Sequence, residues 1–174
     1  RCKDRLDFKG DDLEGIACDP ADASLWIVEE ERREVVHLDV KGEVLARHKL
    51  DLEGKPNSGL EGICLDSSGI AEIVNEKDPG LFIALNADLS IASQREFDFA
   101  EDLSGLDCGD GHFWVLSDQS RMLYRWSPAG GVTGAYPLPC NQAEGKRWII
   151  AAGLVYIVSE SENRLYVYSI AYTE

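Results

Sequence analysis

The sequence lacks any long hydrophobic run, and it has few basic residues. No segment approaches the roughly 18 consecutive apolar residues that cross a membrane as a helix, so we expect no transmembrane segment in this chain. Only 17 Lys and Arg stand against 32 Asp and Glu, which gives a net charge of −15 over 174 residues. A surface of that sign repels phosphate backbones and anionic lipids. The composition therefore argues against nucleic-acid binding and favours a divalent cation or a small cationic ligand as partner.

The sequence also lacks a C-x-x-C pair, although it contains five cysteines. Cys18, Cys64 and Cys108 fall at nearly the same place in successive segments, which predicts small buried residues on inner strands rather than a disulfide framework. Cys2 and Cys140 lie near predicted outer strands and are the candidates for a pair.

What the sequence does contain is an internal repeat of about 40 to 47 residues. A motif of the type Asp-Leu-Glu-Gly-Ile recurs four times, starting at residues 12, 59, 102 and 142, and its third residue is Glu14, Glu61, Ser104 or Glu144. A second motif, an apolar run that ends in an acid, follows each time at nearly the same distance and ends at Glu30, Glu76, Asp118 or Glu160. Two motifs that stay in step four times indicate a repeat architecture.

The repeats consist of short strand-like runs. These runs are rich in β-branched and aromatic residues, alternate with period two, and are separated by Gly, Pro and Asp turns. We therefore predict an all-β fold, a β-propeller of four-stranded antiparallel blades, in a single domain over residues 1–174. The predicted repeats span about residues 11–58, 59–101, 102–141 and 142–174.

The fourth repeat lacks its last strand. An N-terminal strand at residues 4–8 resembles the strand that precedes each later motif, and it is predicted to complete a blade. Two arrangements are then open: four blades that close on themselves, which removes exposed sheet edges, or four blades that are part of a five- or six-bladed ring.

The repeated acids are predicted to gather at one mouth of the propeller channel. Neighbouring strands are antiparallel, so the start of the innermost strand and the end of the second strand lie at the same rim. Clustered carboxylates repel one another unless a cation offsets their charge, and hard oxygen ligands suit Ca²⁺. The candidate metal ligands are Glu14, Glu61, Glu144, Glu30, Glu76, Asp118 and Glu160.

A structural role for the same motifs is the alternative. The acid at the end of the second strand would bind the backbone of the next blade, and the glycine after the first acid would allow tight backbone packing near the axis.

Five segments resemble the SdiA-regulated family of bacterial β-propellers, the YjiK-like proteins: residues 13–17, 25–30, 59–63, 142–145 and 156–160. The resemblance covers nearly the whole chain and implies a periplasmic or cell-envelope location, with the targeting segment absent from this chain. Two places depart from the family pattern, the Lys146-Arg147-Trp148 run and Ser104. The family has no settled biochemical activity, so the resemblance bears on fold more than on function.

Three functions are open at this point. The favoured one is a non-catalytic binding or scaffold propeller of the bacterial cell envelope whose acidic mouth holds a divalent cation, Ca²⁺. A second is a protein-interaction platform that needs no metal. The third is a metal-dependent hydrolase of the phosphoesterase or lactonase type.

The hydrolase would use the same carboxylates. Its ion would be held by Glu14, Glu61 and Glu144, and Glu30 or Asp118 would act as general base. The sequence offers no G-x-S-x-G motif and no phosphate-cradling glycine loop. The basic residues that could hold an anionic substrate at this mouth are Arg32, Arg33 and Lys77.

Overall fold

The computed structural model describes residues 6–55, 58–109, 111–138, 150–151, 154–159 and 161–169, with the backbone alone at 150–151. This part of the chain contains fifteen β-strands and no helix. No helix within it is therefore long and apolar enough to span a membrane. The strands form four antiparallel sheets, each made of strands consecutive in the sequence.

The first sheet has the order β1 (Leu13–Cys18), β2 (Leu25–Glu29), β3 (Glu34–Leu38), β4 (Val44–Lys49). The second has the order β5 (Leu60–Leu65), β6 (Ala71–Asn75), β7 (Leu81–Leu85), β8 (Ile91–Glu96). The third has the order β9 (Gly105–Gly109), β10 (His112–Ser117), β11 (Met122–Ser127), β12 (Gly131–Pro137). The fourth has the order β13 (Ile150–Ala151), β14 (Leu154–Ser159), β15 (Arg164–Ser169). We call these sheets blades 1 to 4.

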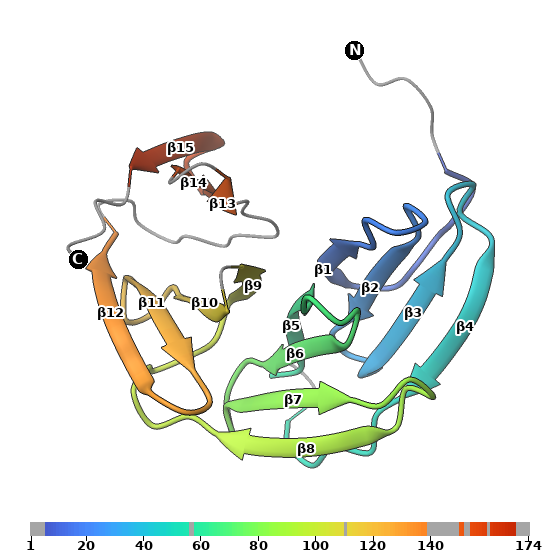
Figure 1. Ribbon diagram of the computed structural model, residues 1–174, viewed down its shortest axis with the longest axis horizontal. Coiled ribbons are helices and arrows are strands. Elements are labelled where there is room, and N and C mark those ends of the chain that lie inside the picture. The colour runs from blue at the N-terminus through green and yellow to red at the C-terminus, as the bar shows by residue number, and fades with distance from the viewer. Residues whose placement is uncertain are drawn as a thin grey trace.

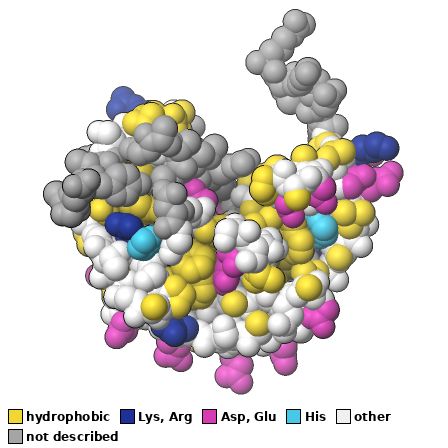
Figure 2. Space-filling view, in the orientation of Figure 1, with side chains coloured by type: hydrophobic (Ala, Val, Ile, Leu, Met, Phe, Trp, Pro, Cys, Tyr) yellow, Lys and Arg dark blue, Asp and Glu magenta, His cyan; other side chains and the backbone are white. Residues whose placement is uncertain are grey.

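The blades follow one another around a common axis, as in a propeller (Figure 1). Strands β1, β5 and β9 lie innermost, and β4, β8 and β12 lie on the outer edge. Middle strands such as β6 are buried along their whole length, whereas the outer strand β8 is mostly exposed. Acidic side chains are spread along the outer edge of the arc, where basic ones are few (Figure 2). The predicted all-β propeller is confirmed.

The hydrophobic core is divided into layers between the blades. One layer joins blades 1 and 2 through residues such as Val28 and Ile73. A second joins blades 2 and 3 around Phe82 and Trp126, and a third joins blades 3 and 4 around Trp114. Apolar contact between neighbouring blades therefore supplies most of the core. A smaller cluster, around Ile27 and Leu38, lies on the other face of blade 1.

Glycine permits the inner strands to approach one another closely. A Cβ atom added at Gly62 of β5 would lie 2.5 Å from the backbone nitrogen of Leu106 in β9. One added at Gly15 of β1 would lie 3.0 Å from the Cα of Gly62. These glycines follow the acid of the first repeated motif, and the structure supports the steric role predicted for them.

The cysteine prediction is wrong in part. Cys64 of β5 and Cys108 of β9 form a disulfide between blades 2 and 3, with their Cα atoms 5.8 Å apart. Cys18 is a free cysteine and is exposed rather than buried. The predicted Cys2–Cys140 pair lies outside the described residues.

The predicted N-terminal strand is not formed in the three of its residues that the structure describes. Residues 6–8 belong to no strand, and Phe8 packs against the apolar face of blade 1. Residues 4 and 5 lie outside the described part of the chain, so the completion of a blade by residues 4–8 stays a prediction.

Candidate metal centre

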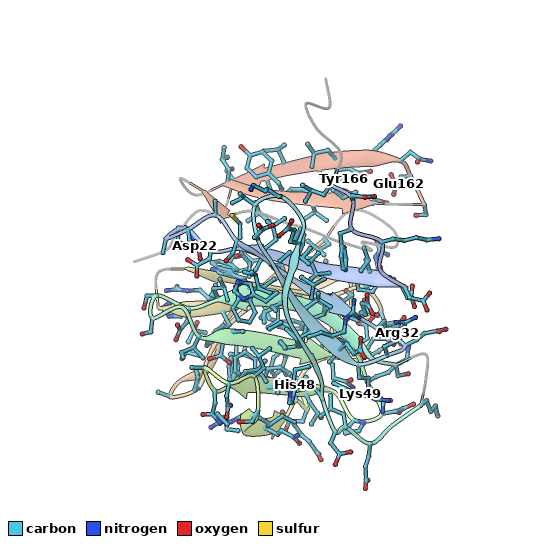
Figure 3. All side chains as sticks on the ribbon, turned by 90° about the vertical axis from the view of Figure 1, so that its right-hand side faces the viewer. Asp22, Arg32, His48, Lys49, Glu162 and Tyr166 are labelled. Carbon is cyan, nitrogen blue, oxygen red and sulfur yellow. A yellow bond between two sulfur atoms is a disulfide. The ribbon has the colours of Figure 1, made fainter. Side chains whose placement is uncertain are left out.

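The two rims of the propeller are distinct, and the repeated acids lie toward one of them. In the side view, Arg32 of the β2–β3 turn and Glu162 of the β14–β15 turn lie on one side of the molecule, and Asp22 of the β1–β2 turn lies on the other (Figure 3). Glu30 and Glu76 directly follow β2 and β6, so they lie at the rim marked by Arg32. We call this rim the acidic mouth.

A β-bulge sets the acid of the innermost strand in blades 1 and 2. Leu13 of β1 pairs with Glu29 and Gly15 pairs with Val28, so Glu14 has no residue opposite it on β2. The same register shift leaves Glu61 of β5 without a residue opposite it on β6. A bulge of this kind bends the strand and re-aims the extra side chain. The two glutamates are therefore placed by the same local irregularity in two blades.

The structure brings five carboxylates together in two groups that share one member. Asp12, Glu14 and Glu30 form the first group, and Glu30, Glu61 and Glu76 form the second. In each group one carboxylate oxygen from every residue lies within 4.8 Å of the others. Two oxygens on opposite sides of a Ca²⁺ ion are separated by about 4.8 Å, because Ca–O distances are about 2.4 Å. The spacing of the carboxylates is therefore compatible with one such ion per group.

The position of Glu30 in the cluster changes its pKa. Burial raises the pKa of Glu30 above its ordinary value, the Gly59 N–H opposes this, and the carboxyl groups of Asp12 and Glu14 raise the pKa further. The Gly59 N–H donates to Oε1 of Glu30 over 3.3 Å, which links blade 1 to the start of blade 2. The predicted contact between a second-strand acid and the next blade is thus present at Glu30.

Asp118 is placed differently from the other acids. Its backbone N–H donates to Oγ of Ser104 over 3.1 Å, and it belongs to neither carboxylate group among the described residues. Ser104, which stands where the other repeats have glutamate, supplies a hydroxyl to blade 3 instead of a charge. Glu144 and Glu160, the candidate ligands from the fourth repeat, lie outside the described residues.

Asp12 is the member of the cluster that the sequence reasoning missed. It is the first residue of the first repeated motif and precedes β1 with a φ of 55°, but it was not among the predicted ligands. The corresponding residue in the third repeat, Asp102, is buried and accepts hydrogen bonds from Oγ of Ser117 and from the Gln119 N–H. An aspartate two residues before the acid position recurs in the first and third repeats, and this recurrence could have drawn attention to Asp12. The two aspartates have different roles in their blades.

A second missed feature is the residue just before each second-strand acid. These residues end the second strand, are fully buried, and hold the turn that follows: Glu29, Asn75, Ser117 and Ser159. Glu29 is paired with Arg47 at 3.0 Å. The side-chain nitrogen of Asn75 donates to the carbonyl of Pro79 over 2.9 Å. These contacts fix the backbone from which the mouth acids project.

The three basic candidates for binding an anionic substrate each have partners within the protein, and the partner of Lys77 is a member of the carboxylate cluster. Lys77 donates to Oε1 of Glu76 over 2.6 Å, and this contact is the main reason that the pKa of Lys77 is raised. Arg33 donates to the backbone carbonyls of Leu52 and Lys55. Arg32 pairs with Asp11 at 3.0 Å. The acidic mouth therefore contains more carboxylates than basic side chains, and Lys77 offsets the charge of one of them.

Solved structures similar to this chain are β-propellers of low sequence identity. A catalytically inactive virginiamycin B lyase from Staphylococcus aureus, solved with quinupristin, is 16% identical, has a TM-score of 0.57, and is matched over 97% of this chain and 59% of its own. Glutaminyl cyclase from Myxococcus xanthus is 13% identical, with a TM-score of 0.68 and coverage of 86% and 62%. The WD40 repeats of RRP9 are 14% identical, with a TM-score of 0.58 and coverage of 94% and 53%.

At these identities the likeness establishes the fold alone. The chain spans between 53% and 62% of the length of these three structures. No curated protein sequence matches the chain. The model of the SdiA-regulated family matches residues 47–169, which is most of the chain, and the protein therefore belongs to the SdiA-regulated family.

Proposed function

We propose that this chain is a non-catalytic binding propeller whose acidic mouth holds a divalent cation, with Ca²⁺ as the expected ion. The observation that carries the proposal is the pair of three-carboxylate groups joined by Glu30. Carboxylates at this spacing repel one another, and a divalent ion would remove the repulsion while supplying coordination to several oxygens at once. Arg32 is paired with Asp11 and Arg33 with backbone carbonyls, which favours ion binding over hydrolysis of an anionic substrate. Lys77 is paired with Glu76, so an ion in the second group would have to displace it from that carboxylate.

A location in the bacterial cell envelope is part of the same proposal. The Cys64–Cys108 disulfide supports it, because disulfides persist in oxidising compartments and are rare in reducing ones. Family membership is consistent with such a location.

Calcium is expected to raise the thermal stability of the chain. An ion that binds only the folded state adds about 2.7 kcal/mol to the free energy of unfolding at a hundredfold excess over its dissociation constant. The measurement is thermal unfolding of EDTA-treated protein with and without millimolar Ca²⁺, repeated with Mg²⁺. A Ca²⁺-selective rise in Tm is expected, because the irregular ligand set suits the larger ion.

The matched variants separate the mouth from general charge effects. Glu30→Gln should abolish most of the Ca²⁺-induced rise in Tm, because Glu30 belongs to both groups. Glu96→Gln removes an exposed carboxylate at the end of β8 and should leave that rise unchanged. The absence of a shift with any divalent ion in the unmodified chain would exclude the metal site and direct attention to a protein partner.

A further inference from the structure

Glu72 of β6 is a buried carboxylate away from the acidic mouth. Glu72 is 8% exposed, and its Oε2 has no hydrogen-bond partner among the described residues. The corresponding residues in the first and third repeats are Trp26 and Trp114, which suit an apolar interface. A buried carboxyl oxygen without a partner is costly, so a specific chemical use for it is worth testing.

Glu72 lies beside the disulfide that joins two blades. It stands directly opposite Cys64 in the β5–β6 pairing, so the two side chains project from the same face of blade 2. That face packs against blade 3, because Cys64 and Val74 belong to the core layer shared with Leu106 and Val115. The disulfide to Cys108 therefore crosses the interface next to the carboxyl group of Glu72.

The two sulfur-bearing residues differ in access to solvent. Cys64 is 4% exposed, whereas Cys108 is only partly buried. Thiol–disulfide exchange begins with attack by a thiolate on the accessible sulfur, and its rate depends on how well the other sulfur leaves. Attack at Cys108 would make Cys64 the leaving group. A thiolate at the buried Cys64 would be unfavourable unless it received a proton.

The surroundings of Glu72 keep a proton available at neutral pH. Ala84 of β7 stands opposite it on the other side, and Phe82 and Phe113 pack together across the same blade interface with ring centroids 4.7 Å apart. Asp66, at the start of the β5–β6 turn, is the charged group whose electrostatic repulsion reaches the carboxyl group of Glu72. Burial, with a further contribution from the Asp66 charge, raises the pKa of Glu72 to about 7.

We propose that Cys64–Cys108 is a thiol-exchange site in which Glu72 protonates the sulfur of Cys64. A thiolate of a dithiol attacks Sγ of Cys108, the Cys64–Cys108 bond breaks, and its electron pair goes to Sγ of Cys64, which takes the proton of Glu72. The second thiol of the reagent then loses its proton and attacks the reagent sulfur of the mixed disulfide. The bond to Sγ of Cys108 breaks, Cys108 leaves as a thiolate that takes up that proton, and the reagent closes as a cyclic disulfide. Two electrons pass to the protein, and the Glu72 carboxylate regains its proton from solvent.

The test is the rate of reduction of the folded, full chain by dithiothreitol, followed by alkylation and peptide-resolved mass spectrometry of Cys64 and Cys108. The rate constant is divided by the concentration of dithiothreitol thiolate at each pH, so that the titration of the reagent does not contribute to its pH dependence. For the unmodified chain it should fall about tenfold from about pH 6 to about pH 8, because an ionised Glu72 repels the developing thiolate. The Glu72→Gln variant should show no such fall, whereas Glu96→Gln should behave as the unmodified chain.

Two results would overturn the proposal. One is a pH-independent rate per thiolate in the unmodified chain, which decides the matter even when Glu72→Gln fails to fold. The other is a rate that does not increase with dithiothreitol concentration, because reduction would then follow unfolding and the disulfide would be purely structural.

Discussion

Replacing Gly62 by alanine is expected to destabilise the protein by about 3 kcal/mol, at the upper end of the range for overpacking. The new Cβ atom would stand 2.5 Å from the Leu106 backbone nitrogen and 3.0 Å from the carbonyl carbon of Gly105. Both contacts are with the backbone of β9, so no side-chain rotation relieves them. Strands β5 and β9 would have to separate, and the core layer between blades 2 and 3 would loosen with them.

Urea-induced unfolding of the variant and the unmodified chain measures this loss. Gly109→Ala is the matched control, because Gly109 ends β9 and a Cβ atom there has no neighbour within 4 Å. That substitution should be neutral or slightly stabilising, since alanine has less conformational freedom than glycine in the unfolded chain. Equal unfolding free energies for Gly62→Ala and Gly109→Ala would show that the inner strands do not approach as closely as described.

Replacing Glu72 by leucine is expected to stabilise the protein in a pH-dependent way. The pKa of Glu72 is about 7 in the folded protein and lies near 4.5 when the carboxyl group is solvated. Between these values the folded state holds a proton that the unfolded state has lost, so the stability of the unmodified chain falls as pH rises through this window. Above about pH 7 the folded state contains a desolvated carboxylate, and a pKa difference of this size corresponds to about 3 kcal/mol.

The leucine variant removes this cost, so it should be more stable than the unmodified chain by about 3 kcal/mol at about pH 8. The gain should be much smaller at about pH 5, where the folded-state carboxyl group is protonated. Urea-induced unfolding of both proteins at the two pH values tests this, because other titrating groups contribute equally and cancel in the difference. A gain that is the same at both pH values would contradict the raised pKa of Glu72.

The repeat and the antiparallel geometry made much of the acidic mouth predictable. Glu14, Glu30, Glu61 and Glu76 follow from the period of the motifs and from the rule that the first strand starts where the second one ends. The β-bulges at Glu14 and Glu61 were not predictable in the same way, because period-two alternation describes a regular strand and says nothing of an inserted residue.

The disulfide was not predicted, because the sequence pattern of one blade does not show which residues of neighbouring inner strands face each other. Cys64 comes three residues after the motif acid Glu61, whereas Cys108 comes four residues after Ser104. Successive side chains of a strand point to opposite faces, so this one-residue difference turns the two sulfurs toward each other across the interface. Cys18 has the same offset as Cys108, and it is the free cysteine of the described part of the chain.

The carboxylate of Glu30 belongs to the cluster at the mouth and also joins two blades. Its carboxylate is a member of both groups at the mouth, and its Oε1 also accepts the hydrogen bond from Gly59 that joins blade 1 to blade 2. Backbone hydrogen bonds continue along this rim, because the Glu76 N–H donates to the carbonyl of Gly59 and the Leu103 N–H donates to the carbonyl of Glu76. If the proposed ion used Oε1, it would weaken the hydrogen bond from Gly59 to Glu30. By thermodynamic reciprocity, a force that separates blades 1 and 2 would then change the affinity for the ion. The mouth would then report on the spacing of the blades, and its occupancy would be a readout of mechanical or partner-induced strain in the propeller.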